Sequence, residues 1–278
     1  MPQRFDSYSP LARILSKQKS PEAAEAWRSL IQHNADNYES YRGCLENEGL
    51  SLGEWIQMHI TLHVSKYPIL LDKPNPEAVA RLEEFASIHP RATAPRRLQL
   101  NLATGSQFKE LAQNYITRGL TKGIPSLFAD LKALYLDKEK QQVIEDIVDN
   151  LRGEYMPTTP RHDVDPTIYL WILYFLSQHY SYLSQHSKAL TLLNLALEHT
   201  PTLPELPMLK GRILKRLGDY VGAARAMNDA RSLDGQDRFL NTKCGKYLLR
   251  AGMVDDAIGI FGMFTKVSPA YYLRPDLC

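Results

Sequence analysis

The stretch GRILKRLGDYVGA, residues 211–223, returns 34 residues later as GKYLLRAGMVDDA, residues 245–257. The two stretches share a small residue at the start, a glycine in the middle and an alanine near the end, as seen in the pairs Gly211 and Gly245, Gly218 and Gly252, and Ala223 and Ala257. Ala189 stands another 34 residues before Ala223, so the spacing extends to a third copy. The pattern predicts three copies of one helical hairpin, with a glycine at each of the last two turns because glycine accepts a positive φ.

A period of 34 residues is typical of tetratricopeptide repeats, whose small residues let two helices approach closely while large residues fill the space beside them. One hairpin of this kind cannot bury its apolar face alone, so consecutive hairpins stack. We therefore expect an all-α fold, a right-handed solenoid of antiparallel helix pairs, with three repeats in residues 167–278.

Composition places the chain among ordinary globular proteins, with 278 residues, 44% hydrophobic and 23% charged residues. The net charge of +2 means that attraction to a polyanion must come from a local cluster. Three widely spaced cysteines, Cys44, Cys244 and Cys278, suit free thiols in a reducing compartment. We find neither an apolar run long enough for a membrane span nor a secretion signal, and expect a cytoplasmic protein.

The first half of the chain, residues 1–153, predicts helical hairpins without a regular repeat. Apolar periodicity and helix-starting residues predict helices that begin at residues 22 and 38 and helices at 52–66, 77–88, 106–118, 124–136 and 138–152. Between them, Pro95-Arg96-Arg97-Leu98-Gln99-Leu100-Asn101-Leu102 alternates leucines and predicts an extended segment. Residues 154–166 hold three prolines and are expected to form a linker.

The sequence offers few candidates for a catalytic or metal-binding site. His59 and His63 stand four apart in the predicted helix 52–66, but no carboxylate lies between them, which favours a structural role. The glycines are scattered and form no phosphate-binding loop, and no nucleophile, base and orienting group can be assembled. We expect a non-enzymatic protein with no catalytic residues and no metal site.

Basic residues gather on the first helices of the second and third repeats. Arg212 and Lys246 are equivalent residues one repeat apart, so both are expected to face one concave groove. The neighbouring positions add further cations and an aromatic residue, namely Lys215, Lys243, Tyr247 and, one turn on, Arg250, with Arg216 and Arg238 at the margins. Such a cluster would attract a polyanion, whereas the alternative is a solvated helix face without a ligand.

Several irregular strings are similar to the large auxiliary subunit of the N-terminal acetyltransferase A complex. They run over nearly the whole chain and include Pro95 to Leu100, Phe108 to Glu110, Thr121 to Gly123, Gln178 to Tyr180, Thr200 to Leu203, Ala223 to Arg225, and Asp237 to Cys244. The resemblance implies a non-catalytic helical scaffold that wraps the catalytic acetyltransferase subunit and tethers it to the ribosome.

The same resemblance implies that an inositol polyphosphate, such as inositol hexakisphosphate, is held by basic residues of the repeats as a structural ligand. Arg212, Lys215, Arg238, Lys243, Lys246 and Tyr247 are the candidate residues for this ligand or for the partner. Binding to a membrane or to a specific nucleic-acid sequence is not expected.

The length of the chain differs from that of the resembled family, and the repeats also allow an alternative function. Proteins of the resembled family are much longer, so the chain corresponds to a fragment, a short isoform or a short paralogue. The alternative function is a general tetratricopeptide adaptor that binds a peptide tail or partner helix. Such adaptors with a carboxylate clamp need repeated Asn and Lys residues, but the equivalent positions here are Gln178, Arg212 and Lys246.

Overall fold

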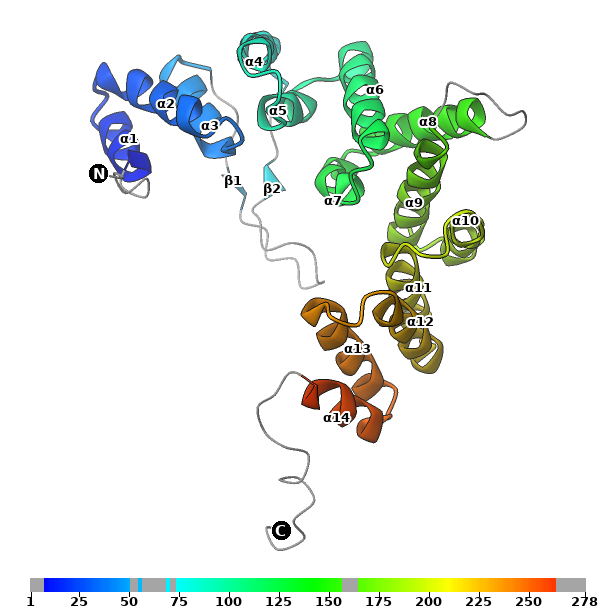
Figure 1. Ribbon diagram of the computed structural model, residues 1–278. Helices are drawn as coiled ribbons and strands as arrows, with labels where there is room; N and C mark the ends of the chain where they lie inside the picture. Colours follow the sequence, from blue (N-terminus) through cyan, green and yellow to red (C-terminus); the bar gives the residue numbers. More distant parts are fainter. Residues whose placement is uncertain (1–7, 51–54, 57–68, 71–73, 157–164, 264–278) are drawn as a thin grey trace, which may run out of the picture. The chain divides into compact units, whose positions relative to one another are not determined.

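The computed structural model describes residues 8–50, 55–56, 69–70, 74–156 and 165–263 (Figure 1). The chain divides into two compact units, one of residues 1–119 with 129–146 and one of residues 120–128 with 147–278. Antiparallel helix pairs make up most of the described part of each unit, which confirms the expected all-α class.

The first unit is built mainly from short helices. In chain order its elements are α1 (Tyr8–Lys17), α2 (Glu22–His33), α3 (Tyr38–Asn47), β1 (Trp55–Ile56), β2 (Ile69–Leu70), α4 (Pro76–Ile88) and α5 (Ala94–Leu102). Residues of both units belong to α6 (Gly105–Thr121), α7 (Leu127–Leu131) and α8 (Lys138–Tyr155), and a 3-10 turn, η2 (Lys132–Leu136), precedes α8. The expected helices at 22, 38, 77–88, 106–118 and 138–152 are therefore present.

The expected extended segment at 95–102 is wrong, because these residues form helix α5. Leu98, Leu100 and Leu102 are all buried, and so are Arg97 and Gln99 between them. The polar residues Arg97 and Gln99 are buried beside the leucines, so the alternation of apolar and polar residues resembles that of a strand although the segment is helical.

Residues distant in sequence hold both ends of α5. The Asp36 carboxylate accepts hydrogen bonds from the backbone N–H of Thr93 at 2.7 Å and of Ala94 at 3.1 Å at the start of the helix. At the other end, the Lys140 ammonium donates to the carbonyl oxygens of Leu100 at 2.9 Å and Asn101 at 2.8 Å. A negative group at the start and a positive group at the end both stabilise the helix dipole.

A second correction concerns the expected helix at 52–66. Trp55 and Ile56 form a short strand instead, antiparallel to β2, with Trp55 opposite Leu70 and Ile56 opposite Ile69. His59 and His63 lie outside the described residues. Helix α8 reaches Tyr155, so the first two residues of the expected linker are helical. Residues 157–164 lie outside the described part, and the domain boundaries stay a prediction.

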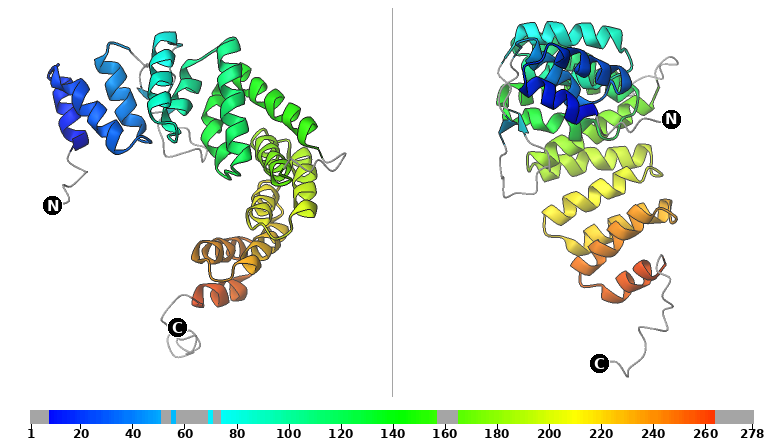
Figure 2. Two further views of the ribbon diagram at one scale, coloured as in Figure 1. Left: turned by 45° about the horizontal axis from the view of Figure 1, so that its top comes forward. Right: turned by 90° about the vertical axis from the view of Figure 1, so that its left-hand side faces the viewer.

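The second unit contains three helical hairpins in succession (Figures 1 and 2). Hairpin 1 is α9 (Thr167–Tyr182) with α10 (His186–His199), hairpin 2 is α11 (Glu205–Arg216) with α12 (Tyr220–Leu233), and hairpin 3 is α13 (Arg238–Arg250) with α14 (Val254–Gly262). The second helices begin 34 residues apart, as the sequence period predicts.

Close packing within the hairpins explains the small residues of the repeat. Ala189, Ala223 and Ala257 are buried at 0–1% exposure. A Cβ atom added to Gly211 would lie 3.0 Å from the carbonyl oxygen of Ala223, and one added to Gly245 would lie 2.5 Å from the Phe261 ring. The second helix therefore leaves no room for a side chain at these glycines.

Candidate functional site: a cationic cluster on the repeats

The candidate cations lie on the first helices of hairpins 2 and 3, and several of them gather around Lys215. Burial lowers the pKa of Lys215, and the positive charges of Arg250, Arg216, Lys243 and Arg212 lower it further. The Lys215 Nζ atom lies 5.5 Å from the centre of the Tyr247 ring. The structure thus brings Arg212, Lys243 and Tyr247 near Lys215, and their role in ligand binding stays a prediction. We call Lys215 with Arg212, Arg216, Lys243 and Arg250 the cationic cluster.

Tyr247 lies within the same field of positive charge. Burial raises the pKa of its phenol, whereas Arg212, Arg250 and Arg216 act in the opposite direction because cations favour the phenolate. The phenol thus stays protonated at neutral pH and offers an O–H donor beside the cations. This combination of donors suits phosphate or carboxylate oxygens.

Arg216 belongs to the cluster and also joins two hairpins. Its Nη1 donates to the carbonyl oxygen of Ser181 at 3.1 Å and to the Ser181 hydroxyl at 2.7 Å. Burial lowers its pKa, and the charge of Arg212 contributes to the same effect. Because Ser181 lies on α9, Arg216 connects hairpin 2 to hairpin 1 as well as contributing charge.

The remaining candidates are less central. Lys246 is exposed one helical turn after Lys243, and the Lys243 ammonium lies 5.2 Å from the centre of the Phe239 ring. Arg238 is exposed at the first position of α13, whereas Arg250 is at its last position. At a rise of about 1.5 Å per residue, the two ends of α13 are roughly 18 Å apart. Arg238 is thus separated from the Arg250 end of the cluster.

Sequence reasoning missed Tyr174 on α9. The Arg212 side chain lies near enough to the Tyr174 phenol to affect its pKa. Burial raises the pKa of Tyr174, while Arg212 opposes this effect. Tyr174 stands one helical turn before Gln178, the equivalent of Arg212 in hairpin 1, so the packing of adjacent first helices was the signal that could have identified it.

The arginines of the Pro-Arg-Arg segment have structural roles in the first unit. Arg96 donates to the carbonyl oxygens of Ala92 at 2.6 Å and Ala86 at 2.9 Å. Arg97 is buried and donates from Nη2 to the carbonyl oxygen of Asp130 at 2.9 Å. These contacts fix α5 and leave both guanidinium groups engaged within the fold.

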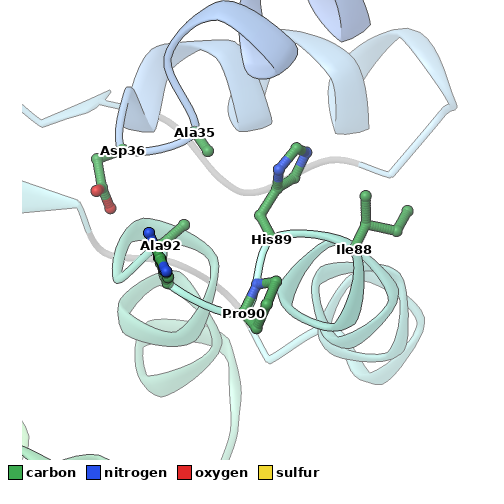
Figure 3. A pocket seen from close by; sticks show the side chains of 7 residues that line it. Ala35, Asp36, Ile88, His89, Pro90 and Ala92 are labelled. Atoms are coloured by element: carbon green, nitrogen blue, oxygen red, sulfur yellow. The ribbon is translucent and has the colours of Figure 1, made fainter.

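A cavity of about 330 Å³ also lies in the first unit, between the α2–α3 and α4–α5 loops (Figure 3). Its walls come from Ala35, Asp36, Ile88, His89, Pro90, Arg91 and Ala92. Burial favours the neutral form of the Asp36 carboxyl, but hydrogen bonds from Thr93 and Ala94 outweigh it and lower the pKa. The carboxylate that borders the cavity is thus already used to start α5.

Other chemistry has little support within the described ranges. There, no group of three histidine, cysteine or acidic side chains could hold a metal ion. Burial, followed by the charge of Glu48, raises the pKa of the Cys44 thiol to about 11, so this thiol stays protonated near neutral pH. In the part of the chain that the structure describes, we find no helix long and apolar enough to cross a membrane.

Comparison with known proteins identifies the family. Residues 10–271 match the family model "N-terminal acetyltransferase A, auxiliary subunit". A mouse relative, "N-alpha-acetyltransferase 16, NatA auxiliary subunit", is 37% identical over 260 residues, which cover 91% of this chain and 27% of the relative. An Arabidopsis thaliana relative, "N-terminal acetyltransferase A complex auxiliary subunit NAA15", is 34% identical over 88% of this chain and 26% of its own length.

A solved structure of a related protein has a similar fold. The chain titled "Structure of Naa15/Naa10 bound to HypK-THB" superposes with a TM-score of 0.80 and 31% sequence identity, over 97% of this chain and 37% of that chain. The present chain spans about a quarter of the length of the curated relatives it matches. With the family model covering nearly all of the sequence, the chain belongs to the family of N-terminal acetyltransferase A auxiliary subunits.

Proposed function

We propose that this chain acts as a non-catalytic scaffold that positions the catalytic subunit of an N-terminal protein acetyltransferase. The observation that carries the proposal is the family match over residues 10–271. It is supported by the helical hairpins of the second unit, because stacked hairpins present broad surfaces for proteins rather than enclosed reaction sites. We place this function in the cytoplasm, on nascent chains at the ribosome.

Co-expression with the catalytic subunit tests the scaffold function. The two proteins should co-purify, and the complex should acetylate peptides that begin with Ser or Ala, while this chain alone should transfer no acetyl group. Acetylation by the isolated chain, after removal of contaminating enzyme, would overturn the scaffold function. Failure of the two proteins to co-purify would show that these residues do not suffice to bind the catalytic subunit.

We also propose that the cationic cluster binds a compact polyanion such as inositol hexakisphosphate. Several cations of hairpins 2 and 3 act on Lys215 together, so one ligand with several phosphates could engage more than one helix. Arg and Lys side chains donate charge-assisted hydrogen bonds to phosphate oxygens, and such bonds are stronger than those between neutral groups. No cofactor is needed for chemistry in this proposal, because the ligand would stabilise the scaffold.

Titration calorimetry with inositol hexakisphosphate tests the polyanion site. The double substitution Lys243→Glu and Lys246→Glu should weaken binding strongly, and binding by the unsubstituted chain should weaken as salt rises. The control is Arg225→Glu, which removes an exposed cation from the second helix of hairpin 2, outside the cluster. Equal affinity of the double variant and the unsubstituted chain would return both lysines to the role of solvated surface residues.

A further inference from the structure

Four exposed apolar side chains mark the turns of hairpins 2 and 3. Leu217 is 51% exposed, Tyr220 45%, Val221 44% and Val254 50%. Leu217 lies in the turn between α11 and α12, Tyr220 and Val221 begin α12, and Val254 begins α14. Tyr220 and Val254 are equivalent residues of consecutive hairpins, so they lie on the same edge of the stack. We call these four residues the turn-edge patch.

The packing of the hairpins does not require apolar residues at these positions. Hairpins 2 and 3 join through a different set of side chains, which includes Ala224, Met227, Cys244 and Leu248. In hairpin 3, Ala251 takes the place of Leu217 and Asp255 takes the place of Val221. Because the same turn forms with a small or charged residue, the larger apolar side chains of hairpin 2 are available for contact with a partner.

Cations border the turn-edge patch. Arg216 directly precedes Leu217, and its equivalent in hairpin 3 is Arg250, which is four residues before Val254. Among the described residues, no ion pair joins an acidic side chain to Lys215, Arg216 or Arg250. The positive charges of Arg250 and Arg216 both lower the pKa of Lys215, so the electrostatic fields of the three side chains overlap. A partner with carboxylates beside an apolar stripe would complement both the charge and the apolar surface.

We propose that the turn-edge patch docks an acidic amphipathic helix of a protein partner, with the carboxylates of that helix directed to Arg216 and Arg250. The inference rests on the proposed scaffold function and adds the chemistry of the partner segment. An anionic membrane is a poorer fit, because a continuous surface of acidic lipids would also meet Asp255 and Asp256 at the start of α14, whereas a helix can direct its carboxylates to Arg216 and Arg250 alone. Apolar residues at every third or fourth position form a stripe along one side of a helix. Such a stripe can pack against an apolar surface like the turn-edge patch.

The test variant uses residues that the fold already accepts. Leu217→Ala and Val221→Asp together copy Ala251 and Asp255 of hairpin 3, and an aspartate in the first turn of a helix is compatible with the helix dipole. The matched control is Leu195→Glu, which changes an apolar residue of similar exposure, 44%, on α10. Circular dichroism spectra and melting curves should show that both variants remain folded.

Fluorescence anisotropy measures binding of a labelled synthetic helix of about 18 residues, with leucines every three or four positions and glutamates elsewhere. The unsubstituted chain and Leu195→Glu should bind it equally, while the double variant should bind at least about tenfold more weakly. A peptide with lysines in place of the glutamates should not bind. Absence of binding by the acidic peptide, or equal binding by the double variant, would overturn the inference.

Two further measurements separate the possible failures. Vesicles that contain phosphatidylserine should not bind the chain through the patch, and patch-dependent vesicle binding would replace the protein partner by a membrane. In the co-expression assay, the double variant should retain less catalytic subunit than the Leu195→Glu control. Full retention by the double variant would refute the patch while leaving the scaffold function standing, whereas no retention by the unsubstituted chain would refute the scaffold function itself.

Discussion

Replacing Ser184 by glycine should stabilise the protein, although the change removes atoms from the folded chain. The turns of the three hairpins place Ser184, Gly218 and Gly252 at the same position, with φ values of 62°, 86° and 77°. In hairpin 1, the backbone of a residue with a side chain therefore lies in the left-handed region, where the steric strain of an L-residue costs about 1–2 kcal/mol. Glycine removes this strain but gains freedom in the unfolded chain that costs about 0.4–1 kcal/mol.

The difference predicts that Ser184→Gly raises the free energy of unfolding by about 0.5–1 kcal/mol. The reverse change Gly218→Ser should lower it by a similar amount, because nothing lies within 4 Å of a Cβ atom added at Gly218 and the backbone strain is then the main cost. Urea titrations followed by circular dichroism at 222 nm, a standard wavelength for helix, measure both. A Ser184→Gly variant that is less stable than the unsubstituted protein would refute the reasoning.

Three further changes test the packing of the repeats and the contacts that hold the two ends of α5. Ala223→Leu should overpack the contact with Gly211 and cost about 1–3 kcal/mol, and an unchanged melting temperature would contradict the repeat register. Lys140→Met should cost about 1–3 kcal/mol in urea titrations, because buried carbonyl oxygens at the end of α5 lose their donor, whereas a neutral result would show that water replaces the ammonium. Asp36→Ala should cost about 0.5–2 kcal/mol at neutral pH. The folded pKa of Asp36 is lowered, so its contribution is present above the unfolded value of about 3.9 and is lost as pH falls below it; a deficit that persists unchanged in acid would contradict this linkage.

The hairpins of the second unit could be predicted from sequence because their determinants are local and periodic. The 34-residue spacing of small residues and turn glycines reports packing between neighbours in the chain. Helix α5 could not be predicted in the same way, because its alternating leucines resemble a strand pattern and its ends are held by Asp36 and Lys140, which are distant in sequence. The short pairing of Trp55 with Leu70 likewise depends on a partner that propensity does not reveal.

The candidate site was predictable to a similar degree. The equivalence of Arg212 and Lys246 pointed to first helices that share a surface, and Lys215, Lys243 and Tyr247 follow from their helical spacing. What sequence could not supply was the contribution of hairpin 1. Arg212 affects the pKa of Tyr174, and Arg216 donates a hydrogen bond to Ser181, across the boundary between hairpins. Both interactions depend on how the hairpins pack.

The supports of α5 have a consequence for the order in which the chain folds during synthesis. Asp36 reaches Thr93 across 57 positions of sequence, and Lys140 reaches Leu100 across 40. Contacts of such separation are slow to form, because a long loop must close before they add stability. The chain leaves the ribosome from its first residue, so α5 emerges with Asp36 available but acquires Lys140 only after about 40 more residues have been added. We expect α5 to become protected from hydrogen exchange late, when α8 has been synthesised, whereas each hairpin of the second unit packs against hairpins that are its neighbours in sequence.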